Sequence, residues 1–131
     1  MNKELVIKSK LENMSLVENF IDEVSIGLSV VSDLYGNLLI STIEAVTNAI
    51  VHGNESNPEK LVHINVDSDD HFINIRVADE GKGFNFEVVP DPTKPDLIEK
   101  PDGRGIFLMK NLADKVTFDK NGSIVTLTFN I

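Results

Sequence analysis

The sequence predicts an α+β fold, and three observations carry that prediction. Apolar residues recur at helical spacing over residues 14–31 and again over 34–52. Apolar and polar residues alternate over 61–66 and 72–77, as they do in strands with one buried face. Asn121-Gly122, a strong signal for a tight turn, joins two further strand-like runs near the end of the sequence. Helices and strands are therefore mixed along one chain.

The first half of the chain begins with a short strand over residues 5–7, followed by the helix over 14–31. Ser32 and Asp33 offer an N-cap for the second helix, because their side-chain oxygens can accept hydrogen bonds from free backbone N–H groups. Gly53-Asn54 ends that helix, and a polar turn follows. The two alternating strands come next, joined by an acidic turn.

The second half contains a long segment without periodicity. Residues 84–102 carry four prolines, and loops of this length in compact domains are usually functional lids or disordered segments. A helix is expected over Ile106–Leu112, and residues 116–119 and 123–130 are expected to close the fold as a hairpin. We therefore expect the order strand, two helices, two strands, lid, helix, two strands.

Composition limits the function classes. A chain of 131 residues predicts a single domain, 1–131. The net charge of -9 opposes a phosphate backbone, so no nucleic acid is expected as a partner. The absence of cysteine excludes disulfides and Cys-based zinc sites. No apolar run approaches the ~20 residues of a membrane span, and the first residues have no signal-peptide core. We expect a cytoplasmic protein without a membrane partner.

Glu44 and Asn48 are the first candidate functional pair. They are four residues apart in a helical stretch and so lie on the same helical face. A carboxylate there can act as a general base, and an amide oxygen beside it can bind Mg²⁺. The alternative is an ordinary solvated polar face. Against it, the flanking residues are apolar, and no Lys or Arg occurs over residues 11–59.

Asp79 follows the second alternating strand directly, with Gly81 and Gly83 after it. An aspartate at the end of a strand can accept a hydrogen bond from an exocyclic amine such as that of adenine. Glycines beside it let the backbone approach a flat ring closely. The alternative is a simple turn, because Asp-x-Gly sequences occur in many loops.

Gly103-Arg104-Gly105 precedes the expected helix at Ile106. A glycine-rich entry to a helix offers free N–H groups and the positive end of the helix dipole to an anion. Arg104 adds a charge that can pair with a phosphoryl oxygen. The alternative is a plain loop-to-helix junction. Neither glycine group has the pattern of a Walker loop or a dinucleotide-binding fingerprint, which excludes a P-loop enzyme.

The three histidines do not form a metal site by their spacing. His63 and His71 are expected on strand faces. His52 lies two turns beyond Glu44 and could reach the same pocket, although a structural role at the end of the helix is the favoured explanation.

The order and spacing of these motifs resemble those of proteins with the Bergerat-type ATP-binding fold, the GHKL superfamily. Within it, the chain most resembles the free-standing anti-sigma factor serine kinases. Two runs carry this closer resemblance, Asp102-Gly-Arg-Gly-Ile-Phe-Leu-Met and Asn111-Leu-Ala-Asp-Lys-Val. The resemblance implies a two-layer α/β sandwich. Its sheet would be mixed and mostly antiparallel, covered on one face by helices, with an ATP lid at about 84–104.

The resemblance also implies a role for each candidate residue. Glu44 would be the general base and Asn48 the Mg²⁺ ligand, while Asp79 would bind the adenine amine. The remaining residues would shape the pocket and contact the phosphates: Gly81, Gly83, Gly103, Arg104 and Gly105, with Arg104 also acting in catalysis. The family usually has Gly-Thr in the closing strand, with the hydroxyl near adenine, and here Gly122-Ser123 keeps that hydroxyl.

The function implied by this resemblance is a protein-serine kinase that uses ATP and Mg²⁺. Its phosphoacceptor would be a small STAS-type anti-sigma factor antagonist, its second partner a sigma factor or another regulated protein, and its assembly a homodimer. One alternative is a nucleotide-gated binding module without useful kinase activity. A histidine-kinase catalytic half would need a histidine-bearing dimerisation helix, and gyrase-like or chaperone-like ATPases would need further domains.

Overall fold

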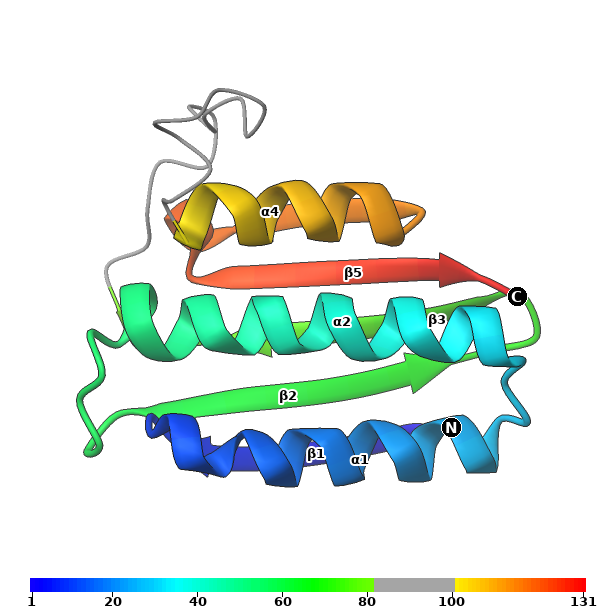
Figure 1. Ribbon diagram of the computed structural model, residues 1–131, viewed down its shortest axis with the longest axis horizontal. Coiled ribbons are helices and arrows are strands. Elements are labelled where there is room, and N and C mark those ends of the chain that lie inside the picture. Colours follow the sequence, from blue (N-terminus) through cyan, green and yellow to red (C-terminus); the bar gives the residue numbers. More distant parts are fainter. Residues whose placement is uncertain (82–100) are drawn as a thin grey trace.

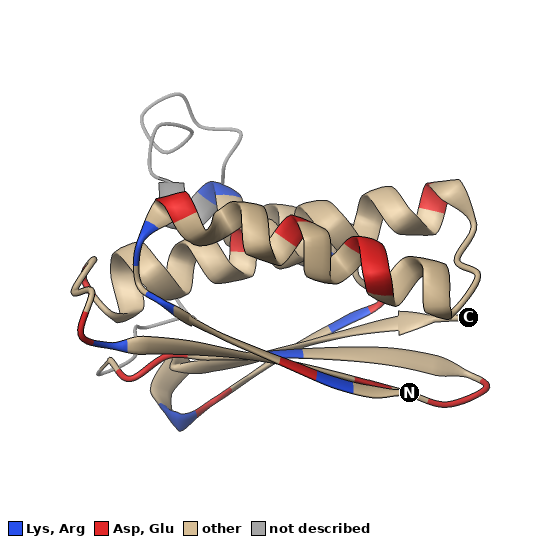
Figure 2. Ribbon diagram, turned by 90° about the horizontal axis from the view of Figure 1, so that it is seen from below, with Lys and Arg blue, Asp and Glu red and all other residues tan. Residues whose placement is uncertain are grey.

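The computed structural model describes residues 1–81 and 101–131, with the backbone alone for 101–103. The described residues form two layers, a sheet and a set of helices (Figure 1). Figure 2 shows that the helices all lie on the same face of the sheet, and the other face is open. The prediction of an α+β fold with helices on one face is confirmed.

The sheet has five strands in the order β1-β2-β3-β5-β4. Their bounds are β1 Asn2–Lys8, β2 Leu61–Ser68, β3 Phe72–Ala78, β4 Lys115–Asp119 and β5 Ile124–Asn130. Every pairing among the described residues is antiparallel, so the expectation of a mixed sheet is wrong for this part of the chain. Antiparallel neighbours need only short connections, which suits the turns between β2 and β3 and between β4 and β5.

The helical layer consists of α1 Met14–Gly27, α2 Ser32–Asn48 and α4 Pro101–Leu112. Short helical segments extend it: η1 Leu11–Asn13, the π-helical segment η2 Ala49–Gly53, and η3 Lys120–Gly122. α4 packs along α2, and α1 packs on the other side of α2. The central helix α2 therefore lies between two neighbours and over the sheet.

The core lies between the layers and follows from the period of two along each strand. One cross-strand row joins Val66, Ile75 and Leu127, and all three side chains are fully buried. The same face of α2 and η2 buries Leu38, Val46 and Ile50. By length and composition alone, the 22-residue stretch Ser32–Gly53 could cross a membrane, but in this fold several of its apolar side chains are part of the core.

The helix boundaries correct several sequence predictions. The first helix ends at Gly27 rather than Val31, because Ser29 adopts a left-handed conformation with φ 52°. The second begins at Ser32, so Val31 takes the N-cap position and no side chain caps the helix. Strand β1 extends on both sides of the expected residues 5–7.

The second glycine group was misplaced by the sequence reasoning. α4 begins at Pro101, five residues before the expected start at Ile106, so residues 103–105 lie inside the helix. Proline suits the first helical position because its missing N–H has no intrahelical partner there. The last residues of the predicted lid, 101–104, therefore belong to α4. The other residues of the predicted lid, 84–100, lie outside the described residues.

Candidate functional site

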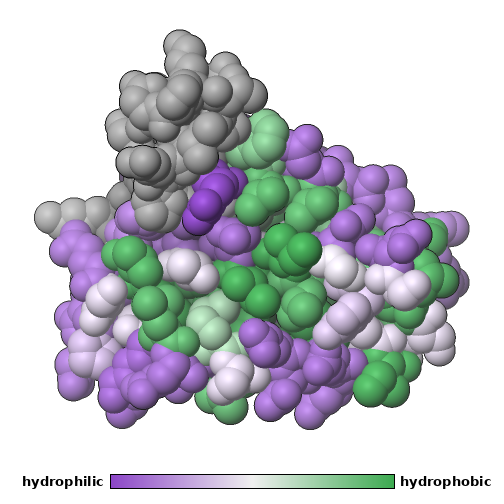
Figure 3. All heavy atoms as spheres, viewed as in Figure 1, coloured by the Kyte–Doolittle hydropathy of each residue, from purple (hydrophilic) through white to green (hydrophobic). Residues whose placement is uncertain are grey.

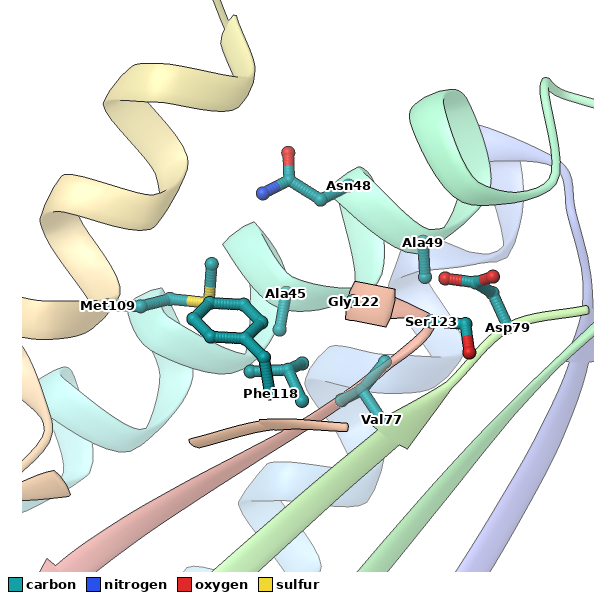
Figure 4. Close-up of a pocket in the computed structure, with 10 residues that line it drawn as sticks. Ala45, Asn48, Ala49, Val77, Asp79, Met109, Phe118, Gly122 and Ser123 are labelled. Atoms are coloured by element: carbon teal, nitrogen blue, oxygen red, sulfur yellow. The ribbon is translucent and has the colours of Figure 1, made fainter. Parts of the chain in front are cut away.

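A small cavity lies between the helical layer and one end of the sheet. It has a volume of about 20 Å³, enough for a water molecule but not for a purine ring. Figure 4 shows the Asp79 carboxylate at one end of this cavity and the Met109 and Phe118 side chains at the other. The lining residues come from α2, η2, β3, α4, β4 and the start of β5: Ala45, Asn48, Ala49, Val77, Asp79, Met109, Phe118, Gly122, Ser123 and Val125.

Glu44 and Asn48 lie on the α2 face that meets α4, as their spacing of four predicts. Both residues are half-buried. The Asn48 Nδ2 atom is buried and has no hydrogen-bond partner among the described residues. A buried amide without a partner costs free energy, so an occupant that hydrogen-bonds or coordinates it would be favoured.

Gly105 on α4 lies directly against this pair. A Cβ atom at Gly105 would lie 3.0 Å from Glu44 Oε2 and 3.1 Å from Asn48 Nδ2. The absence of a side chain therefore leaves a small space between α2 and α4 that polar atoms line. The structure thus brings together three of the predicted site residues from two distant parts of the chain.

The other two members of the second glycine group lie in the same helix. Gly103 is in the first turn of α4, and Arg104 follows it with an exposed side chain. The free backbone N–H groups of a helix are those of its first turn. They consequently lie at residues 102–104, earlier in the chain than the expected helix start at Ile106 implies.

Asp79 follows β3 and lies against two glycines. A Cβ atom at Gly53 would overlap the Asp79 carboxylate, and one at Gly81 would overlap the Gly53 carbonyl. The backbone N–H of Gly81 donates a hydrogen bond to Asp79 Oδ1, with N and O 2.8 Å apart. The carboxylate is therefore enclosed by backbone and held in one orientation.

Burial raises the pKa of the Asp79 carboxyl above its ordinary value, while the Gly81 hydrogen bond and the charge of Lys60 oppose that shift. The direction follows from physical chemistry, because a partly desolvated carboxylate favours its neutral form. Clefts that bind ligands often hold such a perturbed group.

Ser123 lies next to Asp79 through the backbone. The Asp79 N–H donates to the Ser123 carbonyl, with N and O 2.9 Å apart. The Ser123 hydroxyl donates to the Lys120 carbonyl at 2.9 Å, within the turn that includes η3. Ser123 thus lines the cavity as predicted, and its hydroxyl proton is used to hold the turn.

The remaining predicted residues have different outcomes. Gly83 lies outside the described residues. The His52 side chain is exposed at the end of η2 and does not line the cavity formed by the described residues. His63 occupies an exposed position of strand β2, in agreement with the expectation. The prediction for His71 is wrong, because it lies in the turn before β3, where its N–H donates to Asp69 Oδ1.

Sequence reasoning missed several residues of the site. Gly53 and Asn54 appeared only as a helix end, although Gly53 contacts the Asp79 carboxylate and Asn54 binds the backbone of Glu80. Met109 and Phe118 appeared only as parts of a helix and a strand. No sequence signal identified Asn54, because its burial and its hydrogen-bond partners depend on strands that are far apart in the chain.

The donor set suits a magnesium nucleotide better than a metal held by protein alone. Among the described residues, no group of three or more His, Asp or Glu side chains could hold an ion. Mg²⁺ is commonly held by one or two protein ligands together with substrate phosphates. The unpartnered Asn48 amide beside the Gly105 backbone fits that arrangement, because the assignment of O and N in a side-chain amide follows from the partner it meets.

Comparisons with known proteins agree with the fold. Residues 7–129 match the histidine kinase-like ATPase domain. Similar curated proteins include the anti-sigma F factors of Bacillus cytotoxicus, 41% identical over 87 residues, and of Bacillus cereus and Bacillus mycoides, each 40% identical over 87 residues. Each match covers 63% of this chain and 58% of the relative. The match to the domain spans nearly the whole sequence, and the chain belongs to the histidine kinase-like ATPase domain family.

Proposed function

We propose that this protein is an ATP-dependent protein-serine kinase of the anti-sigma factor type, which phosphorylates a small antagonist protein. The observation that carries the proposal is the meeting of Glu44, Asn48 and Gly105, because Asn48 also lines the cavity that holds Asp79. A base, an amide ligand and an enclosed carboxylate are the groups that binding and transferring a nucleotide phosphoryl group would use.

Asp79 would bind the adenine. Its ionised carboxylate accepts a hydrogen bond from the exocyclic amine, and the two glycines beside it leave room for a flat ring. The present cavity of about 20 Å³ is too small for that ring, so the Met109 or Phe118 side chain must shift when the purine enters. Methionine adapts its shape readily because it has three rotatable bonds and no branching.

Asn48 would hold Mg²⁺ together with the phosphates, while the first turn of α4 and Arg104 would contact the phosphate oxygens. When bound, Mg²⁺ would neutralise charge that develops on the transferred phosphoryl group. Phosphoryl transfer asks the protein mainly for positioning and charge stabilisation. The close approach of α4 to α2 at Gly105 supports that assignment.

Glu44 would act on the phosphoacceptor. Its carboxylate accepts the proton of the serine hydroxyl as the hydroxyl oxygen bonds to the γ-phosphorus. The bond from that phosphorus to the β–γ bridging oxygen breaks, and ADP leaves with the bonding electrons. Arg104 stabilises the transferred group through its fixed positive charge.

The partners follow from relatives that are named for action against a sigma F factor. We infer that the phosphoacceptor is a small STAS-type antagonist and that a sigma factor or another regulated protein binds a second surface. Figure 3 shows apolar surface over the middle of the helical layer. Among the described apolar residues, Ile40 of α2 and Phe107 of α4 have exposed side chains. We also propose a cytoplasmic homodimer, for which exposed Leu16 and Ile26 of α1 are candidate contacts.

Glu44→Gln tests this function. The antagonist is first captured by pull-down with ATP or ADP, and its phosphorylated serine is mapped by mass spectrometry. General-base catalysis contributes about 10²–10⁴-fold, so we expect the variant to transfer phosphate at least about 100-fold more slowly. Its affinity for Mg-ATP should stay close to that of the wild type.

Glu59→Gln is the matched control, since it removes an exposed carboxylate that does not line the cavity and should leave both transfer and binding unchanged. Undiminished transfer by Glu44→Gln would remove Glu44 from the reaction. ATP binding without transfer by the wild type to any captured protein would favour a nucleotide-gated binding module instead.

A further inference from the structure

Asn54 is a fully buried polar residue that follows directly after η2. Its Nδ2 group donates to Ser9 Oγ at 2.8 Å and to the Leu61 carbonyl at 3.0 Å. Its Oδ1 atom accepts a hydrogen bond from the backbone N–H of Glu80 at 2.8 Å. Both amide hydrogens and the carbonyl oxygen are therefore used, although the side chain has no contact with solvent.

This one amide joins four separate segments of the chain. Ser9 follows β1 and its hydroxyl donates to the Lys60 carbonyl, while Leu61 begins β2. Glu80 follows β3, and Asn54 itself ends the helix that carries Glu44 and Asn48. The end of β1, the start of β2 and the end of β3 are consequently joined to the end of the central helix by the side chain of Asn54.

The Asp79 turn is held between two such anchors. On one side, the Asp79 N–H donates to the Ser123 carbonyl. On the other, the Glu80 N–H donates to Asn54. Gly53, the neighbour of Asn54, lies directly against the Asp79 carboxylate. The side chain of Asn54 and the backbone before it thus determine where the carboxylate lies relative to η2.

We propose that Asn54 is a positioning residue that fixes the Asp79 carboxylate and so gives the cleft its preference for adenine over guanine. This proposal rests on the proposed adenine contact of Asp79. Adenine presents an amine that donates to a carboxylate, whereas guanine presents a carbonyl oxygen at the corresponding position, which a carboxylate repels. A site built for one hydrogen-bonding pattern rejects the other only if its acceptor is held in place.

The test measures affinities for Mg-ATP and Mg-GTP by titration calorimetry. The two nucleotides share the triphosphate and the ion, so their ratio reports the base contact alone. Asn54→Ala leaves the Glu80 N–H without its acceptor, and the ATP-to-GTP preference should fall by about tenfold, the scale of one hydrogen bond to a charged group. Ser9→Ala is the matched control, because it removes one Nδ2 partner and keeps the Glu80 hydrogen bond. It should keep the preference while its melting temperature falls.

Asp79→Asn distinguishes failure of the positioning role of Asn54 from failure of the adenine contact on which that role rests. If Asp79 binds adenine, the single variant loses the preference, and adding Asn54→Ala to it causes no further loss. An Asp79→Asn variant with wild-type preference would overturn the adenine contact itself. Loss of the preference in Asp79→Asn together with an unchanged preference in Asn54→Ala would overturn only the positioning role.

Asn54→Asp covers the case in which Asn54→Ala does not fold. It keeps an oxygen to accept the Glu80 N–H and loses both Nδ2 donations. We expect lower stability with the ATP-to-GTP preference kept within about threefold, less than the tenfold effect of a lost hydrogen bond. Loss of the preference in a folded Asn54→Asp variant would contradict the positioning role.

Discussion

Asp79 carries its carboxylate half-buried against the backbone of Gly53 and Gly81. Burial raises its pKa in the folded protein, because fewer water molecules solvate the charge. A raised pKa means that the folded state binds the proton more readily than the unfolded chain. The stability linked to this proton is fully present below the unfolded pKa and is lost as the pH rises through the folded pKa.

Asp79→Asn should therefore be at least as stable as the wild type at pH 7, where the wild type has an ionised carboxylate at this position. The asparagine oxygen can still accept the Gly81 N–H. The stability advantage of Asp79→Asn over the wild type should shrink as the pH falls from neutral to below about 3.9, the ordinary aspartate pKa. Urea unfolding of both proteins across this range measures it. If Asp79→Asn is less stable than the wild type at pH 7 and this difference disappears in acid, the Asp79 charge stabilises the fold, which contradicts the prediction.

Individual residues were predictable where spacing carries the information. Glu44 and Asn48 share a helical face by their separation of four, and the structure brings them together beside Gly105. Asn54 was not predictable, because its partners are the side chain of Ser9 and backbone atoms of Leu61 and Glu80. Those contacts exist only after three strands have paired.

At the level of elements, the start of α4 is the main difference between prediction and structure. Glycine is the poorest helix former after proline, costing about 1 kcal/mol relative to alanine, so local propensity places Gly103 and Gly105 outside the helix. Packing along α2 overrides that preference. Gly105 permits a close approach of the two helices over Glu44 and Asn48, which a single sequence gives no means of detecting.

Gly105→Ala tests that approach. A methyl group there would lie 3.0 Å from Glu44 Oε2 and 3.1 Å from Asn48 Nδ2, so these side chains must give way by a few tenths of an ångström. The gain in helix propensity of up to about 1 kcal/mol offsets this crowding. We expect a melting temperature near that of the wild type and affinity for Mg-ATP reduced by about tenfold, the effect of roughly 1.4 kcal/mol.

Gly36→Ala is the control, because a methyl group at Gly36 in α2 meets nothing within 4 Å. It should stabilise the protein by about 0.5–1 kcal/mol and leave nucleotide binding unchanged. Equal affinity of Gly105→Ala and the wild type for Mg-ATP would mean that the space beside Glu44 and Asn48 takes no part in binding.

For the whole molecule, the sequence predicted the layers and the element order better than the cleft. Alternation and helical periodicity indicate which face of each element is buried, and the turn at Asn121-Gly122 joins β4 to β5. The turn contains positive φ values at Asn121 (59°) and Gly122 (91°), which these residue types tolerate. The cleft was less predictable because it is assembled from α2, β3, α4 and β4, which only the strand order brings together.

The central claim is that this cleft binds adenine nucleotides. Thermal unfolding with Mg-ATP, with Mg-GTP and without nucleotide tests it most directly, because a ligand that binds only the folded state stabilises it by mass action. At 100 times its dissociation constant ATP should add about 2.7 kcal/mol, on the order of 10 °C in melting temperature for a domain of this size. GTP at the same concentration should add clearly less, and Asp79→Asn should remove the difference. A melting temperature that ATP leaves unchanged, or that GTP raises equally, would contradict the account.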